Sequence, residues 1–404
     1  MSLIVQKFGG SSVRDTAHLR NVAGIIAETY LEGNDVIVVL SAQGDTTDDL
    51  IEKAQEINPD ASKREMDMLL STGEQISVAL CAMALEGMGL PCISLAAWQV
   101  GIQSTSIHGD ARIKRIDTER VQTELDQHRI VLVTGFQGID PIGDITTLGR
   151  GGSDTSAVAL AAAFHADLCQ IYTDVDGVYT TDPRIVPNAR KLDEISYDEM
   201  LELASQGAQI LHNRSVELAK KFQVSLEVLS SLERKPGTKV REVTKKVEKT
   251  NIAGVAKDVT IARIALVGLQ HNPGVAFQVF DLLSKCNINV DVILQSIGRE
   301  DTKDISFTIH KKDLKEAIEL LEAHKEALRF DHIEADENIG KVSVVGAGLM
   351  TNSGVAAKMF EALYEAGINI QMINTSEIRV SVLLDEEDVN AAVKAIHSKF
   401  FDKA

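Results

Sequence analysis

The sequence is poor in cysteine and in positive charge, and it has no long hydrophobic run near its start. Its four cysteines are far apart and lack a CxxC or Cys/His spacing, so buried reduced thiols are expected and no structural zinc site is indicated. The formal net charge of −18 and the lack of clustered Lys and Arg disfavour a nucleic-acid partner. The apolar run before Lys7 is too short for a signal peptide or a membrane span. We therefore expect a cytoplasmic protein with no nucleic-acid or membrane partner.

The composition is otherwise that of an ordinary globular protein. The chain has 404 residues, of which 44% are hydrophobic and 25% are charged. This length exceeds the usual limit for a single hydrophobic core, so two or three domains are expected.

Short β-branched runs alternate with helical patterns over residues 1–235. The predicted strands are Leu3–Phe8, Asp35–Leu40, Cys92–Leu95, Ile130–Thr134, Gln170–Thr173 and Ser225–Leu229. The predicted helices are Asp15–Leu31, Lys63–Gly87, Asp117–Gln127, Asp154–Ala166, Tyr197–Ser205 and Leu211–Phe222. Strands that alternate with helices predict a parallel or mixed sheet covered on both faces.

A repeat follows this region. Residues 236–252 are polar and charged around a Pro-Gly turn and are predicted to be a linker. Beyond them, NPGVAFQVFDLL from Asn272 recurs as NSGVAAKMFEAL from Asn352, which predicts one small unit at 253–335 and a second at 336–404. Each copy fits a βαββαβ pattern. Such small sheets have open edges, so we expect them to pair with each other or with a second subunit.

Two glycine-rich turns between a strand and a helix are candidate anion sites. In Lys7–Ser12 (KFGGSS) the glycines let backbone amides approach a phosphate and Lys7 adds a positive charge, although a tight turn with an exposed lysine would look the same. Leu148–Thr155 (LGRGGSDT) opens an Ala-rich helix, and Arg150 beside three glycines favours a carboxylate or phosphate clamp over an ordinary capped helix. No GxxxxGK[ST] occurs, which argues against the P-loop class of phosphoryl-transfer enzymes.

Three further motifs are ambiguous when each is taken alone. The segment Thr173–Arg184 (TDVDGVYTTDPR) suits adenine or ribose recognition, or a plain surface turn. Ser71–Glu74 (STGE) fits a helix junction, and Ser41–Asp48 (SAQGDTTD) fits a polar surface loop. Most of these loops follow sheet strands, where α/β folds bind ligands, so a shared site is predicted.

In their order along the chain, KFGGSS, SAQGDTTDDL, STGEQIS, LGRGGSDTSA and TDVDGVYTTDPR resemble the motifs of the aspartate kinases of the amino-acid-kinase family. The repeated C-terminal unit is similar to the paired ACT domains of the same enzymes. The resemblance implies an amino-acid-kinase-like three-layer α/β sandwich followed by two βαββαβ, ACT-like regulatory units. It also implies ATP-dependent phosphorylation of the side-chain carboxylate of L-aspartate to 4-phospho-L-aspartate, the first step toward lysine, threonine and methionine.

The resemblance also implies a role for each motif residue. Lys7 would neutralise the transferring phosphoryl group and Asp154 would orient Lys7, so these two are the expected catalytic residues. Glu74 would hold the amino group of aspartate and Arg150 its α-carboxylate. The remaining expected contacts are Ser41, Thr47 and Ser153 with aspartate, and Lys7, Gly9, Gly10, Thr173, Asp174, Tyr179 and Arg184 with ATP.

The segment GAQILHNRSVE departs from the family pattern. Gln209 stands where relatives often carry a lysine near ATP, and Asn213 stands where a proline is common. Gln209 is therefore not assigned to the nucleotide site.

The chemistry of the implied reaction needs no general base. A carboxylate is already ionised at pH 7, so the protein has to position the reactants and neutralise charge. Magnesium is expected to accompany ATP, bridging its phosphates and keeping several waters, so no residue is assigned as a metal ligand.

Effector binding is expected in the repeated unit. Each copy has a Gly-containing turn at the start of a helix, where backbone amides can hold the carboxylate of an amino acid. The expected residues are Asn272, Gly274, Val275, Asp291, Gln295, Asn374 and Thr375. The resemblance implies lysine, alone or with threonine, bound where the ACT units of two chains meet in a homo-oligomer.

Two alternatives stay open at this point. The first is a catalytically silent amino-acid sensor, against which the intact Lys7, Glu74, Arg150 and Asp154 argue. The second is a related kinase that acts on glutamate, acetylglutamate or uridylate, against which STGE and the tandem ACT-like pair argue.

Overall fold

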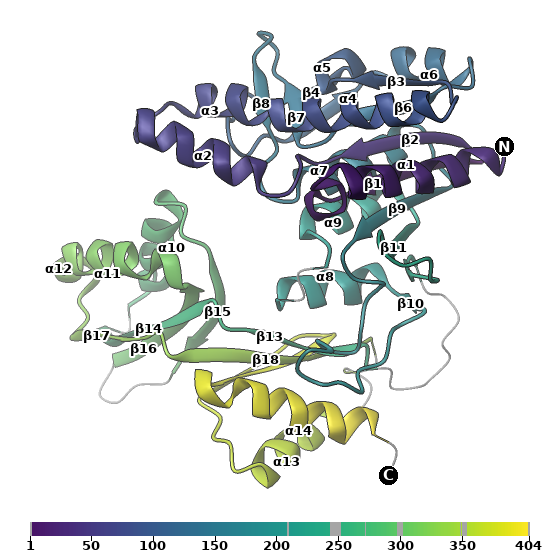
Figure 1. Ribbon diagram of the computed structural model, residues 1–404. Helices are drawn as coiled ribbons and strands as arrows, with labels where there is room; N and C mark the ends of the chain where they lie inside the picture. Colours follow the sequence, from purple (N-terminus) through teal and green to yellow (C-terminus); the bar gives the residue numbers. More distant parts are fainter. Residues whose placement is uncertain are drawn as a thin grey trace. The chain divides into compact units, whose positions relative to one another are not determined.

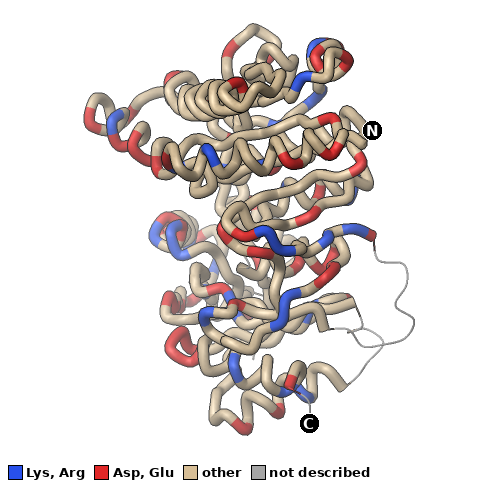
Figure 2. Tube along the Cα trace, turned by 45° about the vertical axis from the view of Figure 1, so that its right-hand side comes forward, with Lys and Arg blue, Asp and Glu red and all other residues tan. Residues whose placement is uncertain are grey.

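The computed structural model describes residues 2–207, 210–242, 252–270, 272–296, 302–347, 349 and 354–402 (Figure 1). By their contacts these residues form two compact units. The N-terminal unit contains residues 2–179, 190–205 and 210–242, and the C-terminal unit contains 180–189, 206–207 and the described residues from 252 onward. Along both units Lys and Arg are dispersed among Asp and Glu (Figure 2).

The N-terminal unit is built on an eight-stranded sheet of order β10-β12-β11-β9-β1-β2-β6-β3. Its strands are β1 (Leu3–Phe8), β2 (Asp35–Leu40), β3 (Cys92–Leu95), β6 (Ile130–Thr134), β9 (Leu168–Thr173), β10 (Glu194–Ile195), β11 (Leu226–Ser230) and β12 (Thr238–Val240). All neighbours pair in parallel except β11 and β12. The mixed sheet predicted from the alternating pattern is confirmed, and β1 and β2 have the predicted limits.

Helices cover both faces of this sheet, giving the predicted three layers. They are η1 (Gly10–Val13), α1 (Thr16–Leu31), α2 (Thr46–Ile57), α3 (Lys63–Leu70), α4 (Thr72–Gly87), α5 (Ala97–Val100), α6 (Glu119–Leu125), α7 (Gly152–Ala163), α8 (Tyr197–Ser205) and α9 (Asn213–Phe222). Val36, Val38 and Leu40 form one cluster with apolar residues of α1 and α4. The intervening residues of β2 point to the opposite face, on which α7 packs against β1, β2 and β9.

The helix predicted at Lys63–Gly87 is divided at Ser71, which ends α3 and begins α4. By length and composition this stretch could cross a membrane, but half of its apolar window is buried inside the protein, and core helices pass the same test. It is therefore weak evidence for a membrane span.

A second, smaller sheet of the N-terminal unit was not predicted. Its strands β4 (Ile102–Ser104), β5 (Ile113–Ile116), β7 (Gln137–Ile139) and β8 (Ile145–Thr147) are in the order β5-β4-β7-β8. Strands of three or four residues are too short to show an alternating pattern. Strand β8 leads directly into the glycine-rich turn before α7.

The C-terminal unit contains two four-stranded sheets of order β15-β16-β14-β17 and β13-β18-β20-β19. The strands are β13 (Gly254–Asp258), β14 (Ile261–Gln270), β15 (Val290–Gln295), β16 (Thr302–His310), β17 (His332–Asp336), β18 (Ile339–Val345), β19 (Met372–Thr375) and β20 (Arg379–Asp385). The helices are α10 (Val275–Lys285), η2 (Lys311–Asp313), α11 (Leu314–Ala323), α12 (Lys325–Leu328), α13 (Gly354–Glu365), η3 (Glu386–Asp388) and α14 (Val389–Phe401). Each repeat therefore forms one sheet with its own helices.

The two repeats differ in the origin of one strand. In the first repeat β17 lies beside β14, whereas the equivalent place beside β18 is taken by β13, which precedes the first repeat in the chain. The sequence division at residue 253 assigns β13 to the first repeat, but its backbone pairs with the second. A small apolar cluster of Ile261, Val292, Ile339, Met372 and Leu383 joins the repeats.

Residues 180–189, which follow β9, also belong to the C-terminal unit. Val186 is buried in the core cluster of the second repeat, and the Val255 N–H donates to the Thr180 carbonyl at 2.7 Å. The Thr180 hydroxyl lies 2.9 Å from His397 Nε2 on α14. This segment is thus an integral part of the second repeat's core.

Candidate active site

The carboxyl ends of four neighbouring strands bring the predicted motifs together. Phe8 of β1 is paired with Leu40 of β2 and with Tyr172 of β9, and Leu40 is paired with Thr134 of β6. The loops after these strands therefore leave the same edge of the sheet (Figure 1). Hydrogen bonds continue across this edge, since the Ser41 N–H donates to the Phe8 carbonyl at 3.1 Å. The predicted shared location of the loops is thus found in the structure.

Lys7 and Asp154 form an ion pair at this edge. Lys7 is the penultimate residue of β1, and Asp154 lies in the first turn of α7. Their side chains are each 12% exposed, and Lys7 Nζ lies 2.7 Å from Asp154 Oδ1. The same amine is near Gly9, because a Cβ added there would lie 3.5 Å from it. A charge fixed beside the glycine turn can attract the phosphates of a nucleotide.

Two glycines allow the first three motifs to meet. A Cβ on Gly10 would lie 2.8 Å from the Ala42 carbonyl oxygen, and one on Gly73 would lie 2.7 Å from Ala42 Cβ. The Gly44 N–H also donates to the Gly10 carbonyl at 3.0 Å. The turn after β2 is therefore packed between the turn after β1 and the start of α4.

Glu74 is a buried carboxylate with only part of its hydrogen-bonding capacity used. It is 3% exposed, and its Oε1 accepts from the Ala42 N–H at 3.1 Å, whereas its Oε2 has no hydrogen-bond partner among the described residues. Burial raises the pKa of the Glu74 carboxyl to about 7, although the Glu74 and Ala42 N–H groups and the Gln137 amide favour the ionised form. A buried oxygen without a partner suits an incoming ammonium group.

Arg150 is presented to solvent by a turn between β8 and α7. It is exposed and has no ion pair with any described residue. Gly149 and Gly151 on either side have φ angles of +75° and +67°, which a residue with a Cβ rarely adopts. Ser153, which follows, is 8% exposed and lies close to Gly135, where a Cβ would be 2.6 Å from its hydroxyl. The guanidinium is thus free to bind an anion.

Thr47 lies in the first turn of α2 and is partly buried. This helix was missed by the sequence prediction, which treated the region as a loop. The structure brings Ser41 and Ser153 to the shared edge, while the contact of Thr47 with a ligand stays a prediction.

The last residue of β9 and the loop that follows it hold three of the expected nucleotide residues. The Thr173 hydroxyl donates to Asp174 Oδ1 at 2.9 Å, and the Tyr179 hydroxyl donates to Asp176 Oδ1 at 2.8 Å. Lys191 Nζ lies 3.1 Å from the second oxygen of Asp176, so both oxygens of this carboxylate have partners within the protein.

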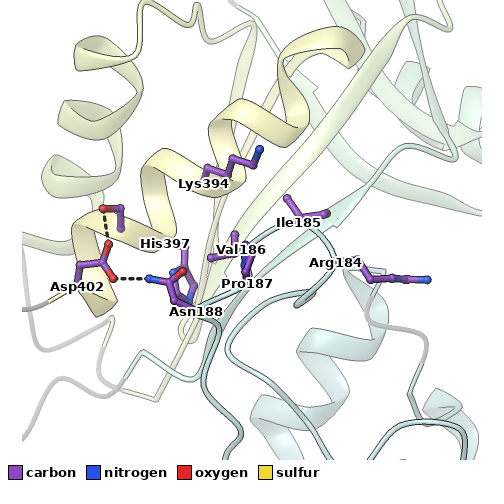
Figure 3. A pocket seen from close by; sticks show the side chains of 9 residues that line it. Arg184, Ile185, Val186, Pro187, Asn188, Lys394, His397 and Asp402 are labelled. Atoms are coloured by element: carbon purple, nitrogen blue, oxygen red, sulfur yellow. Dashed lines mark hydrogen bonds between the residues drawn. The ribbon is translucent and has the colours of Figure 1, made fainter.

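Arg184 differs from these residues, because it belongs to the segment that is part of the C-terminal unit. Its side chain is 89% exposed and pairs with Asp182 at 2.8 Å. Figure 3 shows it beside a cavity of about 400 Å³ with its guanidinium directed away from His397 and Asn188. Its contact with ATP stays a prediction. Gln209 lies outside the described residues, and the Asn213 amide donates to the Ser205 hydroxyl at 2.9 Å.

The described residues contain no group of three or more His, Cys, Asp or Glu side chains arranged to hold a metal. A magnesium ion that arrives with the ATP phosphates needs only one or two protein carboxylates and keeps several waters. A site without a cluster of three metal-binding side chains is therefore compatible with magnesium-bound ATP. All four cysteines are free thiols, and burial raises the pKa of Cys81 to about 12.

Sequence reasoning missed two side chains that support the site. Asp67 of α3 is 1% exposed and accepts two hydrogen bonds from Thr147, and Arg214 of α9 donates to the Leu148 carbonyl. In the single helix predicted at Lys63–Gly87, Asp67 precedes Glu74 by about two turns, which would place both acids on one face. Two acids on an apolar face are a signal that could have identified Asp67.

The expected effector residues lie at corresponding places in the two repeats. Gly274 has a φ of +95° and precedes α10, with Asn272 and Val275 on either side. Gln295 ends β15, and Asn374 and Thr375 end the equivalent β19. Asp291 already has a partner, since its carboxylate pairs with the Lys341 amine, whose side chain is 2% exposed.

Comparison with known families agrees with this architecture. The Amino acid kinase family matches residues 2–230, and the ACT domain matches residues 264–324 and 342–400. The aspartokinase of Bacillus sp. (strain MGA3) is 50% identical over 400 residues, covering 99% of this chain and 97% of the relative. The aspartokinase of Corynebacterium glutamicum is 48% identical over 405 residues, covering 99% of this chain and 96% of the relative.

The chain is also similar in fold to solved structures of an aspartokinase. E. coli aspartokinase III in complex with aspartate and ADP, in the R-state, aligns with a TM-score of 0.82 at 27% identity, covering 99% of this chain and 100% of that chain. The same enzyme in complex with lysine and aspartate, in the T-state, aligns with a TM-score of 0.77 at 27% identity, with the same coverage.

Proposed function

This chain belongs to the aspartokinases of the amino acid kinase family, and on that premise we propose how its residues divide the work of aspartate phosphorylation. The proposal rests mainly on one arrangement, in which the Lys7–Asp154 ion pair lies at the same sheet edge as Glu74, a buried acid with an unpartnered oxygen. A fixed cation and a buried anion at one edge suit a phosphate and an ammonium group. An amino-acid substrate and ATP supply these two groups.

Lys7 acts on the phosphoryl group during transfer. The side-chain carboxylate of aspartate attacks the γ-phosphorus of ATP, the bond to the β–γ bridging oxygen breaks, and ADP leaves. Negative charge spreads over the transferring group, and the Lys7 amine neutralises part of it while the N–H groups of Gly9 and Gly10 line the phosphates. Asp154 holds the amine in place. No group has to remove a proton from the attacking carboxylate.

Glu74 and Arg150 hold the amino-acid part of aspartate. Glu74 Oε2 accepts from the substrate ammonium, and Arg150 binds the α-carboxylate through its two-pronged guanidinium. Ser41, Thr47 and Ser153 complete the site around the substrate. With both main-chain groups held, the side-chain carboxylate is the one left to react.

ATP is held by the loop after β9, with Thr173, Asp174 and Tyr179 at the nucleoside and Arg184 near the phosphates. The ADP in the E. coli aspartokinase III structure supports this choice of nucleotide. When magnesium accompanies ATP, it supplies charge neutralisation between the phosphates. We assign no side chain to it. Because ATP and free aspartate are both cytoplasmic metabolites, we place the enzyme there.

The C-terminal unit senses an end-product amino acid. We assign lysine as the effector, alone or with threonine, because E. coli aspartokinase III has been solved with lysine. The Gly274 turn supplies backbone amides for the effector carboxylate. Gln295 at the end of β15, and Asn374 and Thr375 at the end of the equivalent β19, supply further contacts. The edge strands β15 and β19 leave hydrogen-bonding groups open, which favours a homo-oligomer formed through these repeats. The catalytic domain proposed at 1–235 also takes strand β12 from the predicted linker, whereas residues 180–189 group with the C-terminal unit. The two regulatory units follow the linker.

A coupled assay of ADP release tests the substrate. Aspartate should be turned over, and glutamate, acetylglutamate and uridylate should not. Addition of lysine, threonine or methionine singly and in pairs then identifies the effector. Turnover of another acceptor in preference to aspartate would overturn the assignment, and insensitivity to all three amino acids would leave the C-terminal unit as an oligomerisation device.

A further inference from the structure

Asp67 fixes the chain on the β8 side of the Arg150 turn. Its carboxylate accepts from the Thr147 N–H at 3.1 Å, from the Thr147 hydroxyl at 2.6 Å and from the Gly109 N–H at 3.1 Å. His108 Nδ1 lies 2.9 Å from the same carboxylate. Asp67 is 1% exposed, so these groups replace water completely. One buried acid therefore links α3, the 108–109 loop and the residue three positions before Arg150.

Arg214 holds Leu148, the next residue of the same turn. Its guanidinium donates through Nη1 to the Leu148 carbonyl, through Nη2 to the Ala111 carbonyl at 2.9 Å, and through Nη1 to Asp110 Oδ1 at 3.1 Å. The side chain is 15% exposed. The planar fork of Arg can span the two carbonyls, which the single ammonium of Lys cannot do at the same time.

The glycines of the turn lie directly against these supports. A Cβ on Gly149 would lie 3.1 Å from the Gly109 carbonyl oxygen, and one on Gly151 would overlap the His212 ring. Leu148 is fully buried, and its N–H donates to the Phe136 carbonyl at 2.8 Å. The backbone before Arg150 is thus held by Asp67, Arg214 and the Phe136 carbonyl, while the Arg150 side chain has no ion pair with any described residue.

From this contrast we propose that Asp67 and Arg214 are positioning residues for Arg150: they fix the backbone of its turn so that the guanidinium is held ready for the substrate α-carboxylate. The inference rests on the proposed role of Arg150. A flexible turn would have to be ordered each time aspartate binds, and that entropic cost would appear as weaker binding. Asp67 and Glu74 lie on adjoining helices of one stretch, so that stretch supports both the residue that holds the amino group and the turn that holds the α-carboxylate of aspartate.

The test compares Arg214→Lys and Asp67→Asn with Arg150→Ala, singly and in combination. Each positioning variant should raise the KM for aspartate about 10-fold to 100-fold, as expected when charge-assisted contacts are lost, with the KM for ATP unchanged and kcat reduced less. In the Arg150→Ala background the same substitutions should have almost no further effect on the KM for aspartate, because residues that act through a shared group are not additive. Arg112→Lys is the matched control. Arg112 lies on the loop that also contains Asp110 and Ala111, and its side chain contacts Asp110 at 3.5 Å but not the Arg150 turn.

The outcomes separate two failures. If Arg150→Ala leaves the KM for aspartate unchanged, the proposed role of Arg150 is wrong. Suppose that Arg150→Ala raises the KM for aspartate, and that Arg214→Lys and Asp67→Asn raise it by their full factors again in the Arg150→Ala background. The two residues are then general structural supports, and positioning is refuted. The same conclusion follows if the two variants lower kcat and raise the KM for ATP as much as the KM for aspartate. Thermal unfolding of each variant identifies any that do not fold. Because the two variants act on different residues of the turn, Thr147 and Leu148, either folded one decides the question.

Discussion

Lys7 and Arg150 both lie in glycine-rich turns that connect a strand to a helix, yet the two turns are built in different ways. Lys7 lies on an interior strand of the large sheet, is mostly buried and is paired with Asp154. Arg150 follows an edge strand of the small sheet, is exposed and has no ion pair with any described residue. In the first turn the side chain is fixed. In the second turn the backbone is fixed and the side chain is left open.

The difference corresponds to what each cation has to bind. A charge that must reorient during phosphoryl transfer stabilises the transition state only weakly. A cation that the folded protein already holds in position therefore lowers the activation barrier most effectively. A substrate carboxylate brings its own negative charge, so the cation that receives it needs no internal partner. Removing a side chain should therefore affect catalysis and folding at Lys7, and substrate affinity alone at Arg150.

Lys7→Ala should give the largest effect and should be the strongest evidence for the first half of this comparison. Loss of a positioned charge at the transferring group is expected to lower kcat by at least about 10²–10³-fold. The variant should also be less stable, because Asp154 would remain buried without its partner. Turnover assays and thermal unfolding measure the two losses.

The double variant Lys7→Ala/Asp154→Asn separates these effects. It removes both charges, so stability should partly return while kcat stays low. Recovery of turnover in the double variant would contradict the catalytic role of Lys7.

Arg150→Ala should affect only the substrate. The KM for aspartate is expected to rise about 10-fold to 100-fold through loss of charge-assisted hydrogen bonds. The KM for ATP and the midpoint of thermal unfolding should not change, because the side chain is exposed. A rise in the KM for ATP instead would place Arg150 at the nucleotide and would remove the contrast between the turns.

Glu74 adds a pH dependence to the substrate side. Burial raises its pKa to about 7, so in the free enzyme it is mostly neutral below pH 7 and mostly ionised above it. The ionised form binds the substrate ammonium, so kcat/KM for aspartate should fall about tenfold per pH unit as pH drops below 7. Glu74→Gln should have a low kcat/KM that lacks this pH dependence.

The same pKa shift has a consequence for stability. A carboxyl whose folded pKa is raised costs stability as pH rises from its unfolded pKa of about 4.5 through 7. Glu74→Gln should therefore stabilise the free protein at pH 8, by about 1–3 kcal/mol. Denaturant unfolding at pH 5 and pH 8 measures the effect, and equal changes at both pH values would show that the Glu74 charge is not the cause.

The smallest effect on uninhibited turnover is expected from Gln295→Ala in the first repeat. If lysine disfavours the state that binds aspartate, it should raise the KM for aspartate, and aspartate should weaken lysine binding by the same factor. Gln295→Ala should relieve this inhibition, as titration calorimetry of lysine with and without aspartate can measure. Inhibition seen only in kcat would connect the effector to the Lys7 turn instead.

Asp291 is a less suitable position for this test than the sequence suggests. Its substitution would leave the buried Lys341 amine without its ion-pair partner. Asp291→Asn is therefore expected to lower stability as well as any effector affinity, which Gln295→Ala should not do.

The sequence predicted the parts of the fold that have a strong local pattern. The limits of β1 and β2 were correct because each contains a β-branched apolar run and ends before a polar turn that contains glycine. Helix α2 was missed although Leu50, Ala54 and Ile57 recur at helical spacing, because its polar start is typical of a loop and none of its residues is buried. The pairing of β13 with β18 could not be predicted, since no local pattern encodes which distant strand becomes a neighbour.

The same limit applies to the candidate site, where only features with a local sequence pattern could be predicted. The motif glycines and Lys7 could be identified because close backbone approach and a strand-end charge leave a signal in the sequence. The roles of Asp67 and Arg214 could not be predicted, because they depend on partners such as Thr147 and Leu148 that become neighbours only in the folded chain.

The crossing of the chain between its two units limits how this protein can be divided. Val186 and Gln206 precede the linker, yet Val186 fills the core of the second repeat and the Ser343 hydroxyl donates to Gln206 Oε1 at 3.0 Å. A cut after residue 242 would leave both residues on the upstream fragment. The downstream fragment would then carry a gap in its core, and the two pieces should remain associated after cleavage. Exchange of regulatory modules between relatives by a single crossover in the linker would meet the same obstacle, so a working chimaera would need to exchange residues 180–189 together with the C-terminal unit.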